Sequence, residues 1–327
     1  MAHFLQAHSA SSKGQVIGDL QVRHAKKLKE LKEALANIGE NEPLIAVDAM
    51  QRLGVDYHFQ EEIEAILKKQ CTRASGDEGS DELGVVSLRF RLLRQQGYHV
   101  TTDAFNKFKN NEEFKVDISG LVGLYEASHL SFPGEETLDE AGRRSDQLLT
   151  DWLKNNLDDH QASAVAYSLE YPYHKSLTRF RAKNFLNNFE GKQKWVNVLR
   201  ELAKLEFNMV ESLIRNEVQQ DEDQDGNDGS YIACYVNENQ GCSDEDARAF
   251  VVHRISEEWK FLNKECLSAS NPFSASFTKL ALNVARMVPL MYDYNSQHSL
   301  PSLEENMKSL LSDSFLAQGL SNQRSQA

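Results

Sequence analysis

Apolar side chains recur along most of the chain at the three- and four-residue spacing of an amphipathic helix. Within residues 20–40, for example, Leu20, Leu28, Leu31 and Leu35 are spaced for one helical face. Alternation of the β type is rare, and the chain holds only six prolines. The pattern therefore predicts an all-α protein.

Local turn signals separate the predicted helices. Gly54, Gly97 and the Pro133-Gly134 pair mark breaks, and residues 72–82 form a polar loop. Ser243 is a capping residue followed by three acids, which a helix dipole favours in a first turn. The pattern predicts helices at about 20–40, 43–71 (a pair broken near Gly54), 83–97, 117–130, 135–158, 160–168, 176–188, 194–218, 243–266, 273–291 and 302–317.

The composition changes abruptly at residue 219. Residues 219–230 read QQDEDQDGNDGS, which is polar and acidic and offers no apolar face to bury. We therefore expect a flexible N-terminus over 1–19, a helical domain over 20–218, an acidic junction loop over 219–230 and a separate C-terminal segment over 231–327.

Charge and cysteine content narrow the class of protein. The net charge of −13 argues against binding to nucleic acid or to an anionic membrane surface, and no apolar run is long enough to span a bilayer. The four cysteines form no C-x-x-C pair, so free thiols in a reducing compartment are expected. The start, Met1 to Lys13, is short for a transit peptide and lacks a secretory apolar core. We expect a cytoplasmic protein, with the plastid as the less favoured alternative.

Five stretches, taken in order, resemble the amino-terminal helical domain of plant terpene synthases. Examples of their text are AVDAMQRLGVDYHFQEEI, LRFRLLRQQGYHVTTDAFNKF and SLEYPYHKSLTRFR. The stretches are residues 46–63, 88–108, 123–141, 168–181 and 202–208. Together they cover roughly residues 20–215, in the order and spacing of the family.

The tail resembles a distant part of the same family. Three segments are similar in sequence to the end of the carboxy-terminal catalytic domain: residues 225–238, 256–267 and 271–291. Their sequences are most like those of the linalool and nerolidol synthases. Members of that branch lack the tandem-arginine motif followed by tryptophan, and this chain lacks it too. Arg143, Arg144 and Trp152 lie too far downstream and are one residue short in spacing, so we interpret them as a solvated pair and a core aromatic residue.

The resemblance implies a fold and a chemistry. The fold is a terpene synthase-type helical N-terminal domain plus a remnant of the α-helical catalytic domain. The family ionises geranyl or farnesyl diphosphate with Mg²⁺ or Mn²⁺, so a prenyl diphosphate substrate and that metal are implied. Two motifs hold the metal: D-D-x-x-D, and an Asn/Asp–Ser/Thr–Glu trio at i, i+4 and i+8 that places three oxygen ligands on one helical stripe.

Neither metal motif is intact. Asp158-Asp159 opens no D-D-x-x-D motif, because Ala162 occupies its fifth position. Residues 221–225 fit a D-E-x-x-D variant. However, the sequence around and after them, QDGNDGSY, resembles the segment that lies just downstream of the second metal motif in the family, not of the first. By the resemblance, Glu222 is therefore the surviving final glutamate of the trio.

The other two trio positions, counted back from Glu222, are Ile214 and Val218, and neither offers an oxygen ligand. By domain-size reasoning, about 200 residues are missing near Gln219-Gln220. We therefore expect a chain that is catalytically inactive as written. We also expect part of the apolar stripe on its last helices to be uncovered.

Two other readings stay open. The chain could misrepresent an intact linalool or nerolidol synthase through a faulty gene model or a splice form. Alternatively, it could be a non-catalytic helical interaction or Ca²⁺-binding module. Asp221, Asp223, Asp225 and Gly226 match an EF-hand loop, but Ile232 stands where that loop needs a glutamate.

Further polar residues receive structural interpretations. R-x-R, which helps the family hold diphosphate, occurs at 89–91 and 179–181, where we expect surface or interdomain residues. His58, His129 and His174 are scattered singly and are expected to be structural rather than catalytic.

Overall fold

The computed structural model describes part of the chain, and all regular structure in that part is helical. The described residues are 2–39, 42–74, 82–108, 117–156, 161–218, 235–236, 238–239 and 242–291. The all-α prediction is confirmed. The junction loop 219–230 and the helix expected at 302–317 lie outside the described residues.

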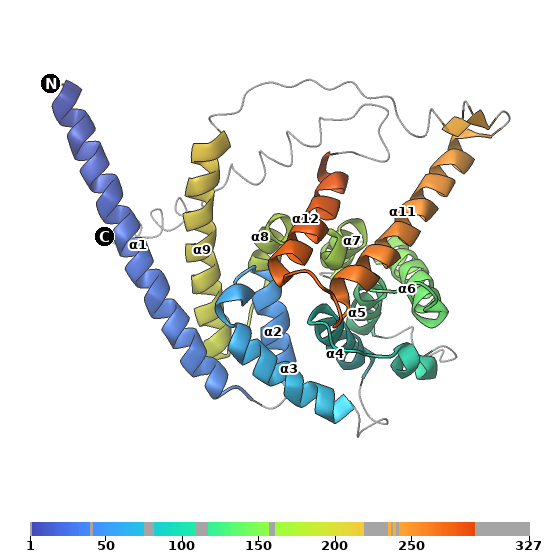
Figure 1. The fold of residues 1–327 in the computed structure, drawn as a ribbon. Coiled ribbons are helices and arrows are strands. Elements are labelled where there is room, and N and C mark those ends of the chain that lie inside the picture. The colour runs from blue at the N-terminus through green and yellow to red at the C-terminus, as the bar shows by residue number, and fades with distance from the viewer. Residues whose placement is uncertain are drawn as a thin grey trace. The chain divides into compact units, whose positions relative to one another are not determined.

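Figure 1 shows the helices in order along the chain. The α-helices are α1 Ala2–Ala36, α2 Pro43–Arg52, α3 Gln60–Ala74, α4 Leu83–Gln95, α5 Ile118–Ser128, α6 Glu136–Asn155, α7 Ala162–Glu170, α8 Thr178–Asn188, α9 Lys194–Val218, α11 Asp244–Leu267 and α12 Ala275–Met291. Short 3-10 helices within the described residues are η1 Asp56–His58, η2 Thr102–Phe108 and η4 Tyr173–Lys175.

Several predicted boundaries are confirmed in atomic detail. Gly54, Gly97 and Gly134 have φ values of 69°, 78° and 88°, a region that glycine enters without the steric penalty of a side chain. The Ser243 side chain accepts a hydrogen bond from the backbone N–H of Asp246 and so caps α11.

One helix starts earlier than the pattern predicts. α1 begins at Ala2, whereas we expected a flexible segment before residue 20. No proline interrupts the first 36 residues, so nothing in the backbone chemistry stops the helix from extending to this end.

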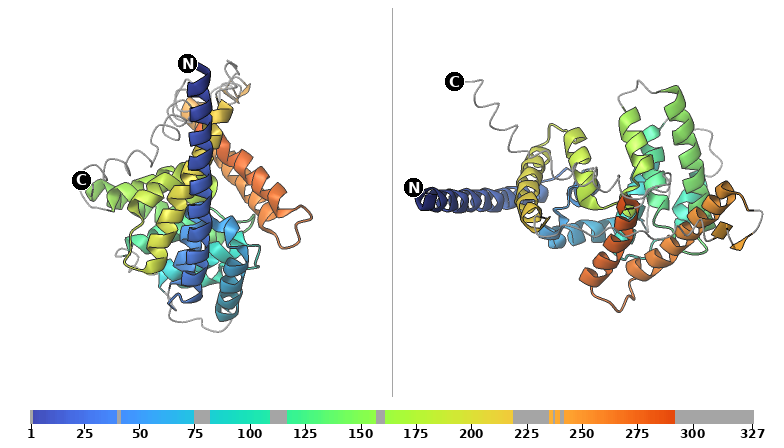
Figure 2. Two further views of the ribbon diagram at one scale, coloured as in Figure 1. Left: turned by 90° about the vertical axis from the view of Figure 1, so that its left-hand side faces the viewer. Right: turned by 90° about the horizontal axis from the view of Figure 1, so that it is seen from above.

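The chain forms two compact units, each assembled from segments far apart in the sequence. Unit 1 comprises residues 1–70, 176–221 and 287–327, and unit 2 comprises residues 71–175 and 222–286. In unit 1, α1 meets α9 (Figure 2), with Lys27 paired to Glu201 at their contact, and α2 packs on α8.

Large apolar side chains fill unit 1. They come from α1, α2, α3, α8 and α9 and from the segment before α3. Among the least exposed are Leu31, Val47, Met50, Val55, Phe59, Ile63, Leu67, Leu186, Leu199 and Leu202. At one edge, the Trp195 indole N–H donates to the Glu42 carboxylate at 3.0 Å. This contact links the start of α9 to the start of α2.

Unit 2 is built around α4, α5 and α6. Its core holds Leu83, Val86, Phe90, Phe105, Leu121, Leu124, Tyr125, Leu138, Leu149 and Val165. A Cβ added at Gly120 would lie 3.3 Å from the backbone N of Gly84, so glycine permits the close approach of α4 and α5. Trp152 packs against this core, as expected, and Arg143 is half-exposed and pairs with Glu140.

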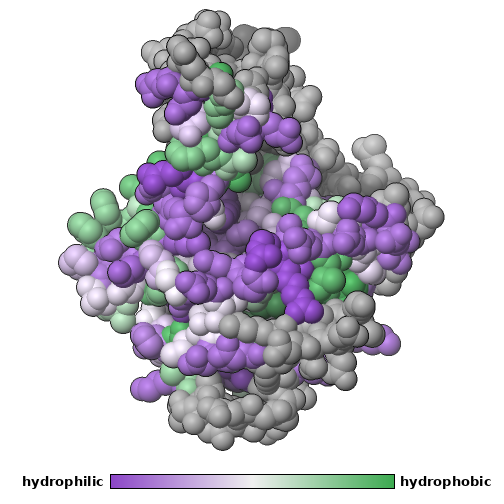
Figure 3. Space-filling model, turned by 90° about the vertical axis from the view of Figure 1, so that its right-hand side faces the viewer, coloured by the Kyte–Doolittle hydropathy of each residue, from purple (hydrophilic) through white to green (hydrophobic). Residues whose placement is uncertain are grey.

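The last two helices keep an apolar surface. Trp259 on α11 and Leu282 on α12 are buried. Other large apolar side chains on these helices, and Phe273 in the connection between them, are exposed. Those on the helices are Phe250, Val252, Phe261, Phe277, Leu280, Val284, Met287 and Val288. Figure 3 shows apolar side chains interrupting the polar surface on one face of the molecule. An uncovered apolar stripe was expected for these helices, and the described residues confirm it.

The surface interpretation of the R-x-R segments is wrong for two arginines. Arg91 is 2% exposed and Arg181 is 6% exposed. The Arg91 guanidinium lies over the Tyr173 ring, with 5.1 Å to its centroid, within unit 2. Partners distant in sequence allow the burial of an arginine that its local context marks as solvated.

None of the helices in the described part of the chain is long and apolar enough to cross a bilayer.

Candidate functional site

The residues predicted to bind the family's metal are placed only in part. Glu222 lies outside the described residues, as do Asp158 and Asp159. Ile214 and Val218 belong to helix α9. Isoleucine and valine have no oxygen with which to bind Mg²⁺, so these residue types do not fit the family's magnesium trio.

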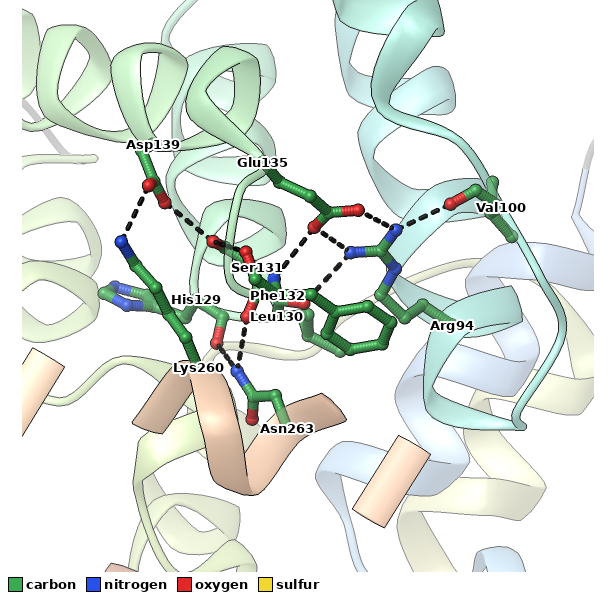
Figure 4. A network of polar contacts seen from close by, with 10 residues as sticks. All are labelled: Arg94, Val100, His129, Leu130, Ser131, Phe132, Glu135, Asp139, Lys260 and Asn263. Atoms are coloured by element: carbon green, nitrogen blue, oxygen red, sulfur yellow. Dashed lines mark hydrogen bonds and ion pairs between the residues drawn. The ribbon is translucent and has the colours of Figure 1, made fainter. Parts of the chain in front are cut away.

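Unit 2 contains a buried polar network centred on Arg94 of α4 (Figure 4). Its guanidinium donates to the Glu135 carboxylate at 2.7 Å and to the backbone carbonyls of Val100 at 2.6 Å and Leu130 at 3.2 Å. The turn at Gly134 brings Glu135 to the start of α6, where its carboxylate also accepts the N–H of Phe132 at 2.8 Å. One side chain therefore fixes three loop segments.

Aromatic rings enclose the same guanidinium. The Arg94 carbon Cζ lies 4.4 Å from the ring centroid of Phe90 and 4.3 Å from that of Phe132. Because a cation is attracted to the ring face, this sandwich stabilises the buried charge together with Glu135.

Asn263 of α11 extends the network into the tail. It is 1% exposed, and its amide N–H₂ donates to the carbonyls of His129 at 2.9 Å and Ser131 at 3.2 Å. One turn earlier, the Lys260 ammonium donates to Asp139 at 2.7 Å. The tail helix therefore docks through specific polar contacts and not through apolar area alone.

His174 completes the network as a neutral group. Its Nε2 lies 2.8 Å from Asn263 Oδ1 and therefore donates the proton, since Oδ1 is an acceptor. Burial lowers the pKa of His174 to about 3, and the positive charge of Arg286 adds to the effect. Arg286 donates its Nε–H to the His174 carbonyl at 2.7 Å. The arrangement has the character of a structural tie, because the Asn263 amide, the Arg286 Nε–H and His174 Nε2 each have a partner within the network.

Unit 1 contains a different polar cluster. His24 from α1, His58 from η1 and Glu206 from α9 bring three ligand atoms within 4.8 Å of one another. His24 Nε2 lies 2.6 Å and His58 Nε2 lies 3.4 Å from the same carboxylate atom, Glu206 Oε2. The hydroxyl of Tyr57 donates to the other oxygen, Oε1.

Burial and hydrogen bonding set the charge of this cluster. Burial opposes ionisation of Glu206, but hydrogen bonds from Tyr57, His24 and His58 outweigh it and lower the pKa of the carboxyl below its ordinary value. Burial, followed by the hydrogen bond to Glu206, raises the pKa of Tyr57. The cluster therefore places a carboxylate and a neutral phenol beside two imidazoles.

Reasoning from the sequence missed this cluster. His58 was interpreted as a single structural histidine, and neither His24 nor Glu206 attracted attention. No local motif links them, because His24 and Glu206 are 182 positions apart. The only signal in the sequence was that His58 and Glu206 both lie in segments that resemble the terpene synthase family, residues 46–63 and 202–208.

A sequence model described as "Terpene synthase, N-terminal domain" matches residues 2–169, about half of the chain. Among curated relatives, "Probable terpene synthase 13" of Ricinus communis is 30% identical, over 84% of this chain and 85% of its own length. An (E)-nerolidol synthase of Cannabis sativa is 26% identical, over 83% of this chain and 88% of its own. A tricyclene synthase of Antirrhinum majus is 40% identical over 66% of this chain, but over only 38% of its own length.

Among solved structures, a limonene synthase with bound 2-fluorolinalyl diphosphate superposes with a TM-score of 0.76. The superposition covers 91% of this chain and 95% of that one at 18% identity, so it shows the fold alone. Three findings point to the same family: the matched N-terminal domain, the 30% identical relative that covers 84% of this chain, and the shared all-α fold. The chain belongs to the plant terpene synthase family.

Proposed function

We propose that this chain is a terpene synthase family member that does not ionise prenyl diphosphates by itself. The single observation that carries the proposal is the composition of the second metal motif, in which Ile214 and Val218 stand where oxygen ligands are required. Within the described residues, no group of three carboxylates converges to replace them.

The length of the alignment supports an internal loss. The alignment with the Ricinus communis relative runs over 492 positions, whereas this chain has 327 residues, so at least 165 positions have no counterpart here. This relative is matched over 85% of its own length, so the missing positions lie largely within the chain and not at its ends. The predicted gap of about 200 residues near Gln219-Gln220 has this size.

The chemistry explains why such a loss would be disabling. Diphosphate departs from an allylic carbon only when its developing charge is offset in a closed, dry pocket. In the family Mg²⁺ or Mn²⁺ supplies that charge when bound. On this proposal, Glu222 is the one remaining ligand of the trio. The exposure of apolar side chains on α11 and α12 supports the loss of helices that would cover them. A cation formed beside them would be open to water.

The product class of an intact relative of this chain is a finer proposal. The resemblance of the tail to linalool and nerolidol synthases, together with the Cannabis sativa nerolidol synthase among its relatives, favours an acyclic terpene alcohol. Water capture of the allylic cation would form it. If the gap is a gene-model error or one splice form, the intact enzyme should make such an alcohol, and full-length transcripts of the locus would contain the missing stretch.

The experiment compares two purified chains. The 327-residue chain and a chain restored with the missing helices are incubated with geranyl or farnesyl diphosphate and Mg²⁺ or Mn²⁺, and the products are separated by gas chromatography. We expect linalool or nerolidol from the restored chain only. Either alcohol from the short chain above the no-enzyme background would overturn the proposal, provided circular dichroism shows both chains to be folded.

A non-catalytic interaction module is a second candidate, because one observation favours it. The exposed apolar residues cluster on α11 and α12, and an apolar patch of this kind can mark an interface. The EF-hand-like residues, Asp221 to Gly226, lie outside the described residues. Analytical ultracentrifugation of the short chain is the first test, and a strictly monomeric species with no tendency to associate would count against this candidate.

A further inference from the structure

We propose that His24, His58 and Glu206 form a binding site for one transition-metal ion, with Zn²⁺ as the preferred ion. The site lies wholly within unit 1 and uses none of the residues of the family's magnesium motifs. Two imidazoles and one carboxylate are a ligand set that Zn²⁺ takes in proteins, with water as the fourth ligand.

The three ligand atoms lie within 4.8 Å of one another, and two of their separations can be compared with zinc geometry. Tetrahedral ligands about 2.0–2.1 Å from a zinc ion stand about 3.3 Å from one another. The 3.4 Å between His58 Nε2 and Glu206 Oε2 already matches that separation. The 2.6 Å between His24 Nε2 and the same oxygen must open by about 0.7 Å. Rotation of two side chains supplies such a shift, and Zn²⁺ would replace the proton that now joins His24 to Glu206.

The backbone that holds the ligands is well braced. α1 contacts α9 where His24 faces Glu206 and Lys27 pairs with Glu201. His58 ends η1, directly after the turn at Gly54. A site built from three packed elements is largely preorganised, so metal binding has little ordering entropy to overcome.

Tyr57 orients the carboxylate. Its hydroxyl donates to Glu206 Oε1 and so leaves Oε2 turned toward both imidazoles. Hydrogen bonds of this kind to a metal ligand fix its orientation and raise affinity. Arg179, a nearby cation, is directed at the Phe207 carbonyl, to which its Nη2 donates at 3.0 Å.

The exposure of the cluster admits a metal ion and a water ligand. The side chains of His24 and Glu206 are 11% and 13% exposed, whereas that of His58 is 23% exposed and forms the accessible edge. Mg²⁺ and Ca²⁺ prefer sites made only of oxygen ligands, so the two imidazoles select against them. The bound ion would cross-link α1, η1 and α9 and so stabilise their packing.

The test uses the full chain with Zn²⁺ and Co²⁺ as probes. We expect one equivalent of Zn²⁺ to bind in calorimetry, and saturation to raise the thermal midpoint by about 5–10 °C. Mg²⁺ at the same concentration should do neither. Glu206→Gln and His58→Gln should each lose at least about tenfold in Zn²⁺ affinity, whereas His99→Gln, at an exposed histidine outside unit 1, should lose nothing.

Cysteines require a second readout, because Cys71, Cys242 and Cys266 belong to no disulfide and a thiolate can also bind Zn²⁺. The Co²⁺ complex should show the spectrum of nitrogen and oxygen ligands without an intense thiolate band. His58→Gln guards against misfolding, since its side chain is the most exposed of the three ligands and the metal-free variant should melt as the wild type does. A thiolate spectrum, or unchanged affinity in folded His58→Gln and Glu206→Gln, would overturn the proposal. Neither outcome depends on prenyl diphosphate turnover.

Discussion

The two units of the molecule each contain a buried polar cluster, and the clusters are completed in different ways. In unit 2, the donors of Arg94 and Asn263 are met mainly by backbone carbonyls and by one carboxylate. In unit 1, the side chains of Tyr57, His24 and His58 converge on one carboxylate, Glu206.

This difference separates structural ties from binding sites. A buried backbone carbonyl that accepts a hydrogen bond from a side chain cannot move to another donor. Removing that side chain therefore leaves the carbonyl buried and unsatisfied. Imidazoles that share one carboxylate can release their proton and accept a metal in its place. The first kind of cluster should respond strongly to mutation and the second kind to ligands.

The largest expected effect is at the centre of the unit 2 network. Arg94→Met should lower the free energy of unfolding by about 3–4 kcal/mol, because Glu135 and two carbonyls lose their charged donor in a buried place. Urea unfolding followed by circular dichroism measures it. Arg143→Met is the matched control, since its pair with Glu140 is half-exposed and the change should leave stability almost unchanged. Equal losses in both variants would contradict the structural role of Arg94.

The next effect is on the tail. Asn263→Leu keeps the volume of the side chain but removes its hydrogen bonds, leaving the carbonyls of His129 and Ser131 unsatisfied. We expect a loss of about 2–3 kcal/mol in unfolding free energy. Asn239→Ala, at an exposed asparagine with a local bond to Tyr235, is the control and should have a much smaller effect. If both variants unfold alike, the tail is held by apolar contacts alone.

Local chemistry made much of the fold predictable. Gly54, Gly97 and Gly134 break helices because the backbone turns there, and Ser243 caps α11 through an atom three residues away. Signals of this kind need only neighbours in the sequence. The start of α1 was misplaced because residues 2–19 lack the apolar period that marked residues 20–40, although nothing in them stops a helix.

Contacts between distant segments were beyond the same reasoning. Arg91 resembles a surface residue of an R-x-R segment until the ring of Tyr173 covers it. His58 looks solitary until α1 and α9 bring His24 and Glu206 to it. The proposal that Ile214 and Val218 replace two metal ligands of the family needs residue identity alone, and it stays a prediction. The sequence did not predict the new cluster, because that depends on packing.

The pH dependence of unit 2 gives a smaller effect. The folded-state pKa of His174 is about 3, below its ordinary value of 6.5, so the unfolded state binds a proton that the folded state refuses. Stability from this group is fully present above about pH 6.5 and is lost as the pH falls toward 3. Between about pH 7.5 and about pH 5.5 the loss should be about 1.4 kcal/mol.

The variant His174→Gln isolates that effect. A glutamine amide can still donate to Asn263 Oδ1 but does not titrate, so the stability of the variant should fall less between the two pH values. His99→Gln, at an exposed histidine, should keep the wild-type dependence. A variant at position 174 with an unchanged slope would show that His174 is not the group responsible.

The smallest expected effect on stability is in unit 1, where it sharpens the contrast between the two clusters. Tyr57→Phe removes the hydroxyl that holds Glu206 Oε1, and because Tyr57 is 50% exposed the loss in unfolding free energy should be only about 0.5–1 kcal/mol. The freed carboxylate can rotate away from His24 and His58, so the affinity for Zn²⁺ should fall about tenfold although every metal ligand is retained. Calorimetry with Zn²⁺ measures this change, and Tyr235→Phe in unit 2 is the control. A Tyr57→Phe chain with wild-type affinity would mean that packing of α1 on α9 orients the carboxylate without help, whereas a large loss of stability without metal would place this cluster with the structural ties of unit 2.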